Sequence, residues 1–165
     1  MADLYRIDYH KWLGQQRELL ARRQFEQLDI ENLLEAMEYE MGNPAETLES
    51  YLSVLVLHLL KYDYQIRILK DPWVEDRVAH LWKVSVINAR SKVKKQISKH
   101  PHLQSITGES LAEAYLDAKK DAVKEMNVHA RSEAQRLNNN SFPKECPWTF
   151  DQIMTEDWLP ETDNG

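Results

Sequence analysis

The stretch from residue 43 to residue 70, NPAETLESYLSVLVLHLLKYDYQIRILK, constrains the fold of this chain more than any other. Apolar side chains recur in it at the three- and four-residue spacing of a buried helical stripe, and further valines and leucines widen the apolar surface beyond one face. A helix this apolar needs neighbours on several sides. The pattern therefore predicts a long central helix inside a helical bundle. Its apolar residues are Leu48, Tyr51, Leu52, Val54, Leu55, Val56, Leu57, Leu59 and Leu60.

Local signals at both ends set the expected limits of this helix. Asn43 and Glu46 have the spacing of a capping box, and Pro44 suits the first helical position because its missing N–H would be unpaired there. At the other end, Pro72 pushes the residue before it out of the helical region. We therefore expect the helix to run from Asn43 to Lys70.

Four more helices are predicted around the central one. A helix over 29–41 has a narrow apolar stripe and ends at Gly42, so a tight helical hairpin is expected at 42–44. The other three are expected over 8–23, 72–99 and 110–126, the second of them ending at His100-Pro101. No alternating pattern demands a sheet. The chain is thus predicted to be all-α, a bundle of about five helices.

The last residues differ in character from the bundle. Aromatic residues and prolines are too frequent after residue 141 for a disordered end, and one short helix is expected from about Thr149 to Met154. We expect a single domain over 1–165, with the bundle in 1–141 and an aromatic-rich tail in 142–165 that packs on it.

Composition and cysteine usage indicate a compartment. The apolar run over 54–60 is too short to span a bilayer, and the first residues lack the basic start and apolar segment of a secretion signal. Cys146 is the only cysteine, which fits a reducing environment. A cytoplasmic protein without a membrane segment is expected.

Charge is divided between two segments. No Lys or Arg occurs over 24–60, where acids are frequent, and no Asp or Glu occurs over 78–108, where lysines are frequent. The formal net charge of -6 argues against nucleic-acid binding, because neutralising phosphates needs a basic surface. Two opposed segments in one small protein more often face each other or water. Binding of nucleic acid through Lys83–Lys99 is kept as an alternative.

Several spaced motifs together resemble a bacterial family known as domain of unknown function 29. They are Tyr9-x-x-Trp12, Leu28-Asp29, Glu35-x-x-Glu38, HLLK at 58–61, Tyr64-Gln65, Trp82-x-x-x-Val86-x-x-x-Arg90, FPKECPW at 142–148 and Trp158-Leu159-Pro160. The resemblance implies an all-helical fold and brings no established activity, cofactor or catalytic residue.

The sequence departs from this family pattern at four places. Ala36 stands where a second consecutive acid is usual, and Ile66 replaces a proline. Additional residues occur between Gln65 and Trp82 and over 127–141. The departures predict longer helices or a changed interface.

A polar stripe on the central helix is the most site-like feature. Tyr51, Val54, His58, Lys61 and Gln65 follow one another at a spacing of three or four residues, which places them on one face. Polar groups on a buried helix need partners. The candidate binding residues are therefore Tyr51, His58, Lys61 and Gln65. In the alternative interpretation, His58 is hydrogen-bonded at the edge of the core and has no binding role.

A metal site is the catalytic alternative. If the predicted hairpin brought Glu35 and Glu38 to His58, the group would resemble the carboxylate-histidine sites of helical bundles. The Glu-x-x-His motif that such sites use on two helices is absent, and pairing of the glutamates with cations is the expected role. No cofactor is predicted.

Other reactive residues lack a catalytic pattern. Cys146 lies between Glu145 and Pro147 in an aromatic segment without a nucleophile signature, so it is expected to fill a small apolar space. Glu125 and His129 are one turn apart, which is typical of a pair across a helix turn. We therefore predict no catalytic residue.

Aromatic residues near the start of the fourth helix are candidates for an interface. Trp73, Trp82 and Arg90 belong to residue types that often anchor partners, although core packing would use the tryptophans as well. The function favoured by the sequence is a non-catalytic cytoplasmic interaction module whose partner is another protein, a homo-oligomer being one form. The alternatives are a metalloprotein or hydrolase using His58 with Glu35 and Glu38, and the nucleic-acid binder.

Overall fold

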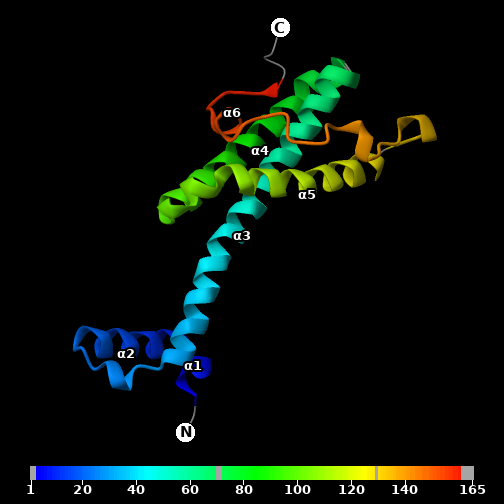
Figure 1. The fold of residues 1–165 in the computed structure, drawn as a ribbon. Helices are drawn as coiled ribbons and strands as arrows, with labels where there is room; N and C mark the ends of the chain where they lie inside the picture. The colour runs from blue at the N-terminus through cyan, green and yellow to red at the C-terminus, as the bar shows by residue number, and fades with distance from the viewer. Residues whose placement is uncertain (1–2, 70–71, 129, 161–165) are drawn as a thin grey trace. The chain divides into compact units, whose positions relative to one another are not determined.

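The structure, a computed structural model, describes residues 3–69, 72–128 and 130–160, with side chains except at 67–69 and 72–79. These ranges form six α-helices and short 3-10 and π turns, without a strand (Figure 1). The predicted all-α class is confirmed. The α-helices are α1 (Leu4–Ile7), α2 (Tyr9–Ala21), α3 (Ile30–Asp63), α4 (Pro72–Lys99), α5 (Thr107–Val128) and α6 (Phe150–Met154). The turns are η1 (Phe25–Gln27), η2 (Tyr64–Leu69), η3 (Pro101–Ile106), η4 (Glu133–Gln135) and η5 (Asn139–Ser141).

The chain divides into two compact units, Met1–Asn43 and Pro44–Gly165, and the boundary falls inside α3. In the first unit, Asp29 links α2 to the start of α3. Its carboxylate accepts hydrogen bonds from Asn32 Nδ2 at 2.8 Å and from the indole of Trp12 at 3.0 Å, and its own N–H donates to Gln16 Oε1 at 2.8 Å. The bonds from Asn32, which act most strongly, and from Trp12 lower the pKa of Asp29, while burial acts in the opposite direction. The expected helix start at Asp29 is thus fixed by three side chains.

The predicted hairpin at 42–44 is wrong. Gly42, Asn43 and Pro44 all lie inside α3, which continues from Ile30 to Asp63. Pro44 is buried, and its carbonyl accepts a hydrogen bond from Gln96 Nε2 at 3.1 Å. This tertiary contact holds a residue that local signals assign to a helix start. The expected end at Lys70 lies outside the described residues; α3 gives way to the π-helical turn η2 at Tyr64.

The core of the second unit is built on the C-terminal part of α3. Figure 1 shows α4 and α5 beside this part of the helix. Five of its side chains, Leu48, Leu52, Leu55, Val56 and Leu59, have no exposed surface, and they form one cluster with α4, α5 and the tail. The predicted stripe is therefore the centre of the bundle. The cluster includes Val86, Ala89, Val93, Leu111, Ala114, Tyr115, Ala118, Ala122, Phe142, Ile153 and Leu159.

The tail after residue 141 is fixed to α4 and α5 by hydrogen bonds to its carbonyl groups. Arg90 donates from Nε to the carbonyl oxygen of Ile153 at 2.6 Å and from Nη2 to that of Trp158. Tyr115 donates its hydroxyl proton to the carbonyl oxygen of Pro143 at 2.5 Å, and burial raises its pKa to about 12. Thr149 caps α6 through a capping box, and this short helix lies where the sequence predicts one.

Helices that could cross a membrane are absent from the described residues, since none is long and apolar enough.

Candidate functional site

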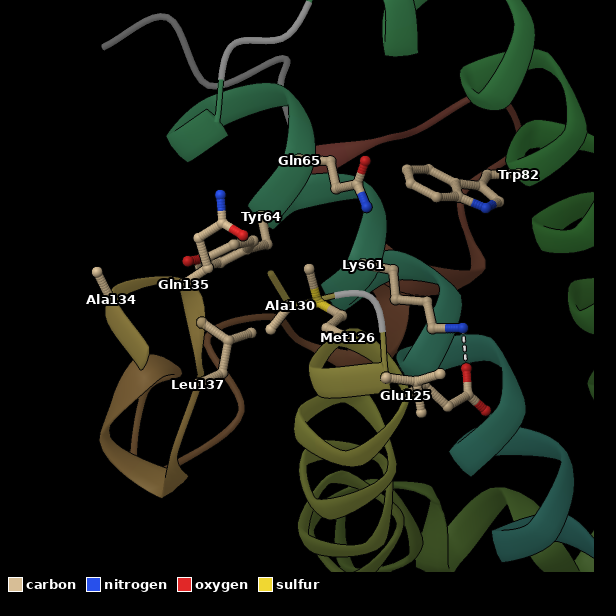
Figure 2. A pocket seen from close by; sticks show the side chains of 11 residues that line it. Lys61, Tyr64, Gln65, Trp82, Glu125, Met126, Ala130, Ala134, Gln135 and Leu137 are labelled. Atoms are coloured by element: carbon tan, nitrogen blue, oxygen red, sulfur yellow. Dashed lines mark ion pairs between the residues drawn. The ribbon is translucent and has the colours of Figure 1, made fainter. Parts of the chain in front are cut away.

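A pocket of about 680 Å³ opens in the second unit between the end of α3, α4, the end of α5 and the segment that follows α5 (Figure 2). Aromatic rings of Tyr64 and Trp82 form its walls, and Figure 2 shows them on opposite sides of Gln65. The remaining lining is mostly apolar, with polar groups at a few points, as in binding pockets generally. The other lining residues are Lys61, Glu125, Met126, Val128, Ala130, Ala134, Gln135 and Leu137.

Two local features place the walls. The π-helical turn η2 begins at Tyr64, and π turns often occur at functional sites because the extra residue re-aims the side chains. At the end of α5, the Asn127 side chain clamps the backbone of Leu137, accepting from its N–H at 2.7 Å and donating to its carbonyl oxygen at 3.0 Å. This pair of bonds turns the intervening segment back toward η2, so that Gln135 and Leu137 line the pocket.

An ion pair lies at the edge of the pocket. Lys61 Nζ contacts Glu125 Oε2, which joins the last turn of α3 to the last turns of α5 (Figure 2). The Lys61 side chain is largely covered, whereas that of Glu125 is half exposed. The pair therefore stays accessible to a ligand with a charged or strongly polar group.

The predicted polar face is divided between two hollows. Lys61 and Gln65 line the large pocket, whereas Tyr51 and His58 line a smaller hollow of about 190 Å³ between α3 and α4. Lys92 lies over the ring of Tyr51, with Nζ 5.9 Å from its centroid. One helical face thus contributes to two separate hollows.

His58 is half-buried in the smaller hollow. Burial, and after it the charge of Lys61, lowers its pKa, while Glu125 acts in the opposite direction. Among the described residues its Nδ1 atom has no hydrogen-bond partner. The imidazole is therefore held in its neutral form.

The residues of the candidate interface, Trp73, Trp82 and Arg90, do not share one surface role. Trp82 is half-buried and lines the large pocket. Arg90 is 8% exposed and binds tail carbonyls, so its guanidinium is not available on the surface where an interface would need it. The side chain of Trp73 lies outside the described residues.

The arrangement proposed for a metal does not form through a hairpin. Glu35 and Glu38 are exposed residues of the first unit, and α3 continues where the chain was expected to turn back toward His58. In the parts of the chain that the structure describes, no three His, Cys, Asp or Glu residues gather as a metal-binding group. Nothing in the geometry supports this alternative.

Cys146 is half-buried, and burial raises the pKa of its thiol. The thiol donates a hydrogen bond to the carbonyl oxygen of Trp148 at 3.3 Å. A thiol held in this form is a poor nucleophile, because the thiolate is the reactive species. The expected pair of Glu125 with His129 cannot be followed, since His129 lies outside the described residues.

Sequence reasoning missed part of the large pocket. Tyr64 stands next to the predicted Gln65, and Met126 is the last residue of the helix expected over 110–126, so both had a local signal. Nothing in the sequence around Gln135 and Leu137 indicated that they line a pocket. The only available hint was Asn127, an amide near a helix end, where side chains often bond to the backbone of a following loop.

No curated protein and no solved structure matches the chain. The model of one family, described as Domain of unknown function DUF29, matches residues 4–159 of the 165. The motifs on which the resemblance was based lie inside this range, apart from the final Pro160, and so do both hollows. The chain therefore belongs to the family described as Domain of unknown function DUF29.

Proposed function

We propose that the protein is a non-catalytic interaction module of the bacterial cytoplasm and that the large pocket binds a segment of a partner protein. The observation that carries the proposal is the pocket wall, in which Tyr64 and Trp82 stand on either side of Gln65 (Figure 2). Aromatic side chains are frequent among the residues that dominate binding energy at protein interfaces.

The lining fits a peptide with one large apolar or aromatic side chain. Met126 and Leu137 offer apolar contacts, and methionine adapts to differently shaped partners because its side chain is flexible. Gln65 carries a donor and an acceptor, which is what the backbone of an extended peptide requires. Gln135 offers its Nε2 donor, since its Oε1 already accepts from the Arg131 N–H at 2.9 Å. The Lys61–Glu125 pair at the edge supports selection of a polar neighbour in the bound segment.

Binding without chemistry is supported by the residue types present. The described lining contains no His, Cys, Ser or Thr, and the only ammonium group, that of Lys61, is already paired with Glu125. A nucleophile with an adjacent base, as covalent catalysis needs, is therefore missing from the described wall.

Selection from a library of displayed random peptides tests the proposal. The immobilised protein should enrich peptides with a large apolar or aromatic anchor. A synthetic copy of an enriched peptide should bind Ala134→Trp at least about tenfold more weakly, because the new indole fills the place of the anchor. Fluorescence anisotropy of the labelled peptide measures the affinity.

The matched control is Ala112→Trp. Ala112 is an exposed alanine of α5 that lines another hollow, beside Cys146. This variant should bind the peptide as the wild type does. Equal binding by Ala134→Trp, or turnover of a substrate by the purified protein, would exclude a peptide-binding pocket without catalysis.

A further inference from the structure

The part of α3 in the first unit has an exposed apolar stripe. Ile30, Leu34, Met37 and Met41 are between 54% and 76% exposed, although they follow one another at the spacing of four, three and four residues. The three steps span 11 residues, close to three turns of an α-helix, so the four side chains form one apolar seam along the helix, and such a seam normally packs against a partner. An apolar seam left in water is therefore an unoccupied contact surface within the described chain.

Carboxylates line both sides of this stripe. At about 100° per residue, Glu31 and Glu38 fall on one flank and Glu40 on the other, and all three are exposed. No Lys or Arg occurs over 24–60 to neutralise them locally. We call the stripe and these glutamates the acidic seam.

The outer face of α4 has the opposite charge. Leu81, Val84 and Ile87 are between 45% and 65% exposed on the side of the helix away from the core. Lys83 flanks them on one side, further lysines follow on this face beyond Ile87 toward the end of the helix, and the sequence over 78–108 has no acid. We call this face the basic seam; its lysines are Lys83, Lys94, Lys95 and Lys99.

None of these seven charged groups has an ion-pair partner among the described residues. Each seam therefore combines exposed apolar surface with unpaired charges of one sign. Both are helical faces that combine exposed apolar residues with charged groups, and the charges of the two faces are opposite in sign. Like seams would repel each other, because carboxylates would meet carboxylates.

We propose that the acidic seam binds the basic seam of a second copy of this chain. Each copy carries both seams, so a dimer with two such contacts is the smallest assembly in which all four are covered. The contact excludes water from the apolar centres, and the charges select the pairing of unlike seams. This role is separate from the large pocket.

Charge reversal with mixing tests the contact. One variant carries Glu31→Lys and Glu38→Lys, so both of its seams are basic. The other carries Lys83→Glu, Lys94→Glu and Lys95→Glu, which leaves one lysine beside three carboxylates, so both of its seams are acidic. Sedimentation equilibrium over a range of concentrations gives the dissociation constant of each variant alone, of the mixture and of the wild type.

The wild type should dimerise, and each variant alone should do so at least about tenfold more weakly, because like charges face each other. An equimolar mixture should recover the dimer, since both contacts then join unlike seams. Recovery also shows that both variants are folded. The controls Glu133→Lys with Glu145→Lys, and Lys120→Glu with Lys124→Glu and Lys144→Glu, change the same numbers of exposed charges elsewhere and should dimerise normally.

The proposal is overturned by a wild type that stays monomeric at every concentration, by variants that dimerise normally, or by a mixture that stays monomeric. A monomeric wild type that binds duplex DNA or RNA with steeply salt-dependent affinity would assign the lysines to nucleic acid instead. Neither variant changes the lining of the large pocket, and Ala134→Trp changes neither seam. Failure of one proposal can thus be told from failure of the other.

Discussion

Arg90 shows how a single side chain can decide the shape of a segment far along the sequence. Its charge type and its place on a lysine-rich helix suggested a surface residue, yet it is buried and donates to the carbonyl oxygens of Ile153 and Trp158. Burial lowers its pKa, and Asp157 opposes that shift. A planar guanidinium reaches two acceptors at once, which an ammonium group does not do with the same geometry.

Replacing Arg90 with Met should lower the free energy of unfolding by about 2–4 kcal/mol, because two carbonyl groups lose their donors in a part-buried place. Urea denaturation measures this change, and limited proteolysis should show earlier cleavage after residue 141. The control Lys120→Met removes an exposed cation from α5, outside both seams, and should change stability by less than about 0.5 kcal/mol. A stability loss no larger than that of the control would contradict the role of Arg90.

His58 gives a pH dependence of known sign. Its pKa in the folded protein is lowered from 6.5, first by burial and then by Lys61, so the unfolded chain takes up a proton at this residue first as pH falls. The contribution of His58 to stability is therefore present above about pH 6.5 and decreases as pH falls from there toward the folded pKa.

The variant His58→Gln should lose that part of the pH dependence. Urea midpoints measured between about pH 5 and pH 8 should fall less steeply with acidification than those of the wild type. His102→Gln replaces an exposed histidine and should keep the wild-type slope. Identical slopes for the wild type and His58→Gln would show that His58 has the same pKa in both states.

Among the helices, α3 shows which helix limits can be predicted from the sequence and which cannot. The starts at Asp8, Asp29 and Thr149 were predictable because each depends on a cap within three residues. The sequence around Gly42 and Pro44 carries the same kind of local signal, but the helix continues because burial of Pro44 and its bond from Gln96 act over a long distance. A contact with a residue on another helix cannot be predicted from the residues next to Pro44 in the sequence.

Gly42→Ala distinguishes a continuous helix from a hairpin. A methyl group at Gly42 meets no atom within 4 Å, and no described glycine has a positive φ. Alanine inside a helix is more stable than glycine, so the variant should gain about 0.5–1 kcal/mol in urea denaturation. Gly14→Ala, at an equally open position inside α2, should gain a similar amount. A loss of stability at Gly42 alone would indicate the left-handed glycine of a helix end.

At the scale of the whole molecule, the fold class could be predicted from the sequence, whereas the candidate site could be predicted only in part. The buried stripe of α3 is a repeating pattern of apolar residues, which can be recognised in the sequence without knowing which helices pack against it. The pocket depends on the Asn127 clamp and on which helix covers which turn, so Lys61 and Gln65 were found while His58 was assigned to the same site. Contacts of this kind are not encoded by spacing.

The core of the second unit contains only residues of that unit. Every side chain of the apolar cluster lies between Leu48 and Leu159, and the partly buried residues packed against it begin at Ala45. A fragment over 44–165 therefore retains the full cluster, together with the hydrogen bonds of Arg90 and Tyr115 that hold the tail.

This fragment should fold alone and unfold cooperatively, because a domain with a complete apolar core needs no other part of the chain to bury it. Its thermal midpoint should lie within a few degrees of the main transition of the full chain, as measured by calorimetry, and Arg90→Met should lower both midpoints alike. A second fragment over 1–141 is the control: it lacks the tail residues of the cluster and should unfold at lower temperature. A fragment over 44–165 without a cooperative transition would show that residues before 44 are needed to complete the core.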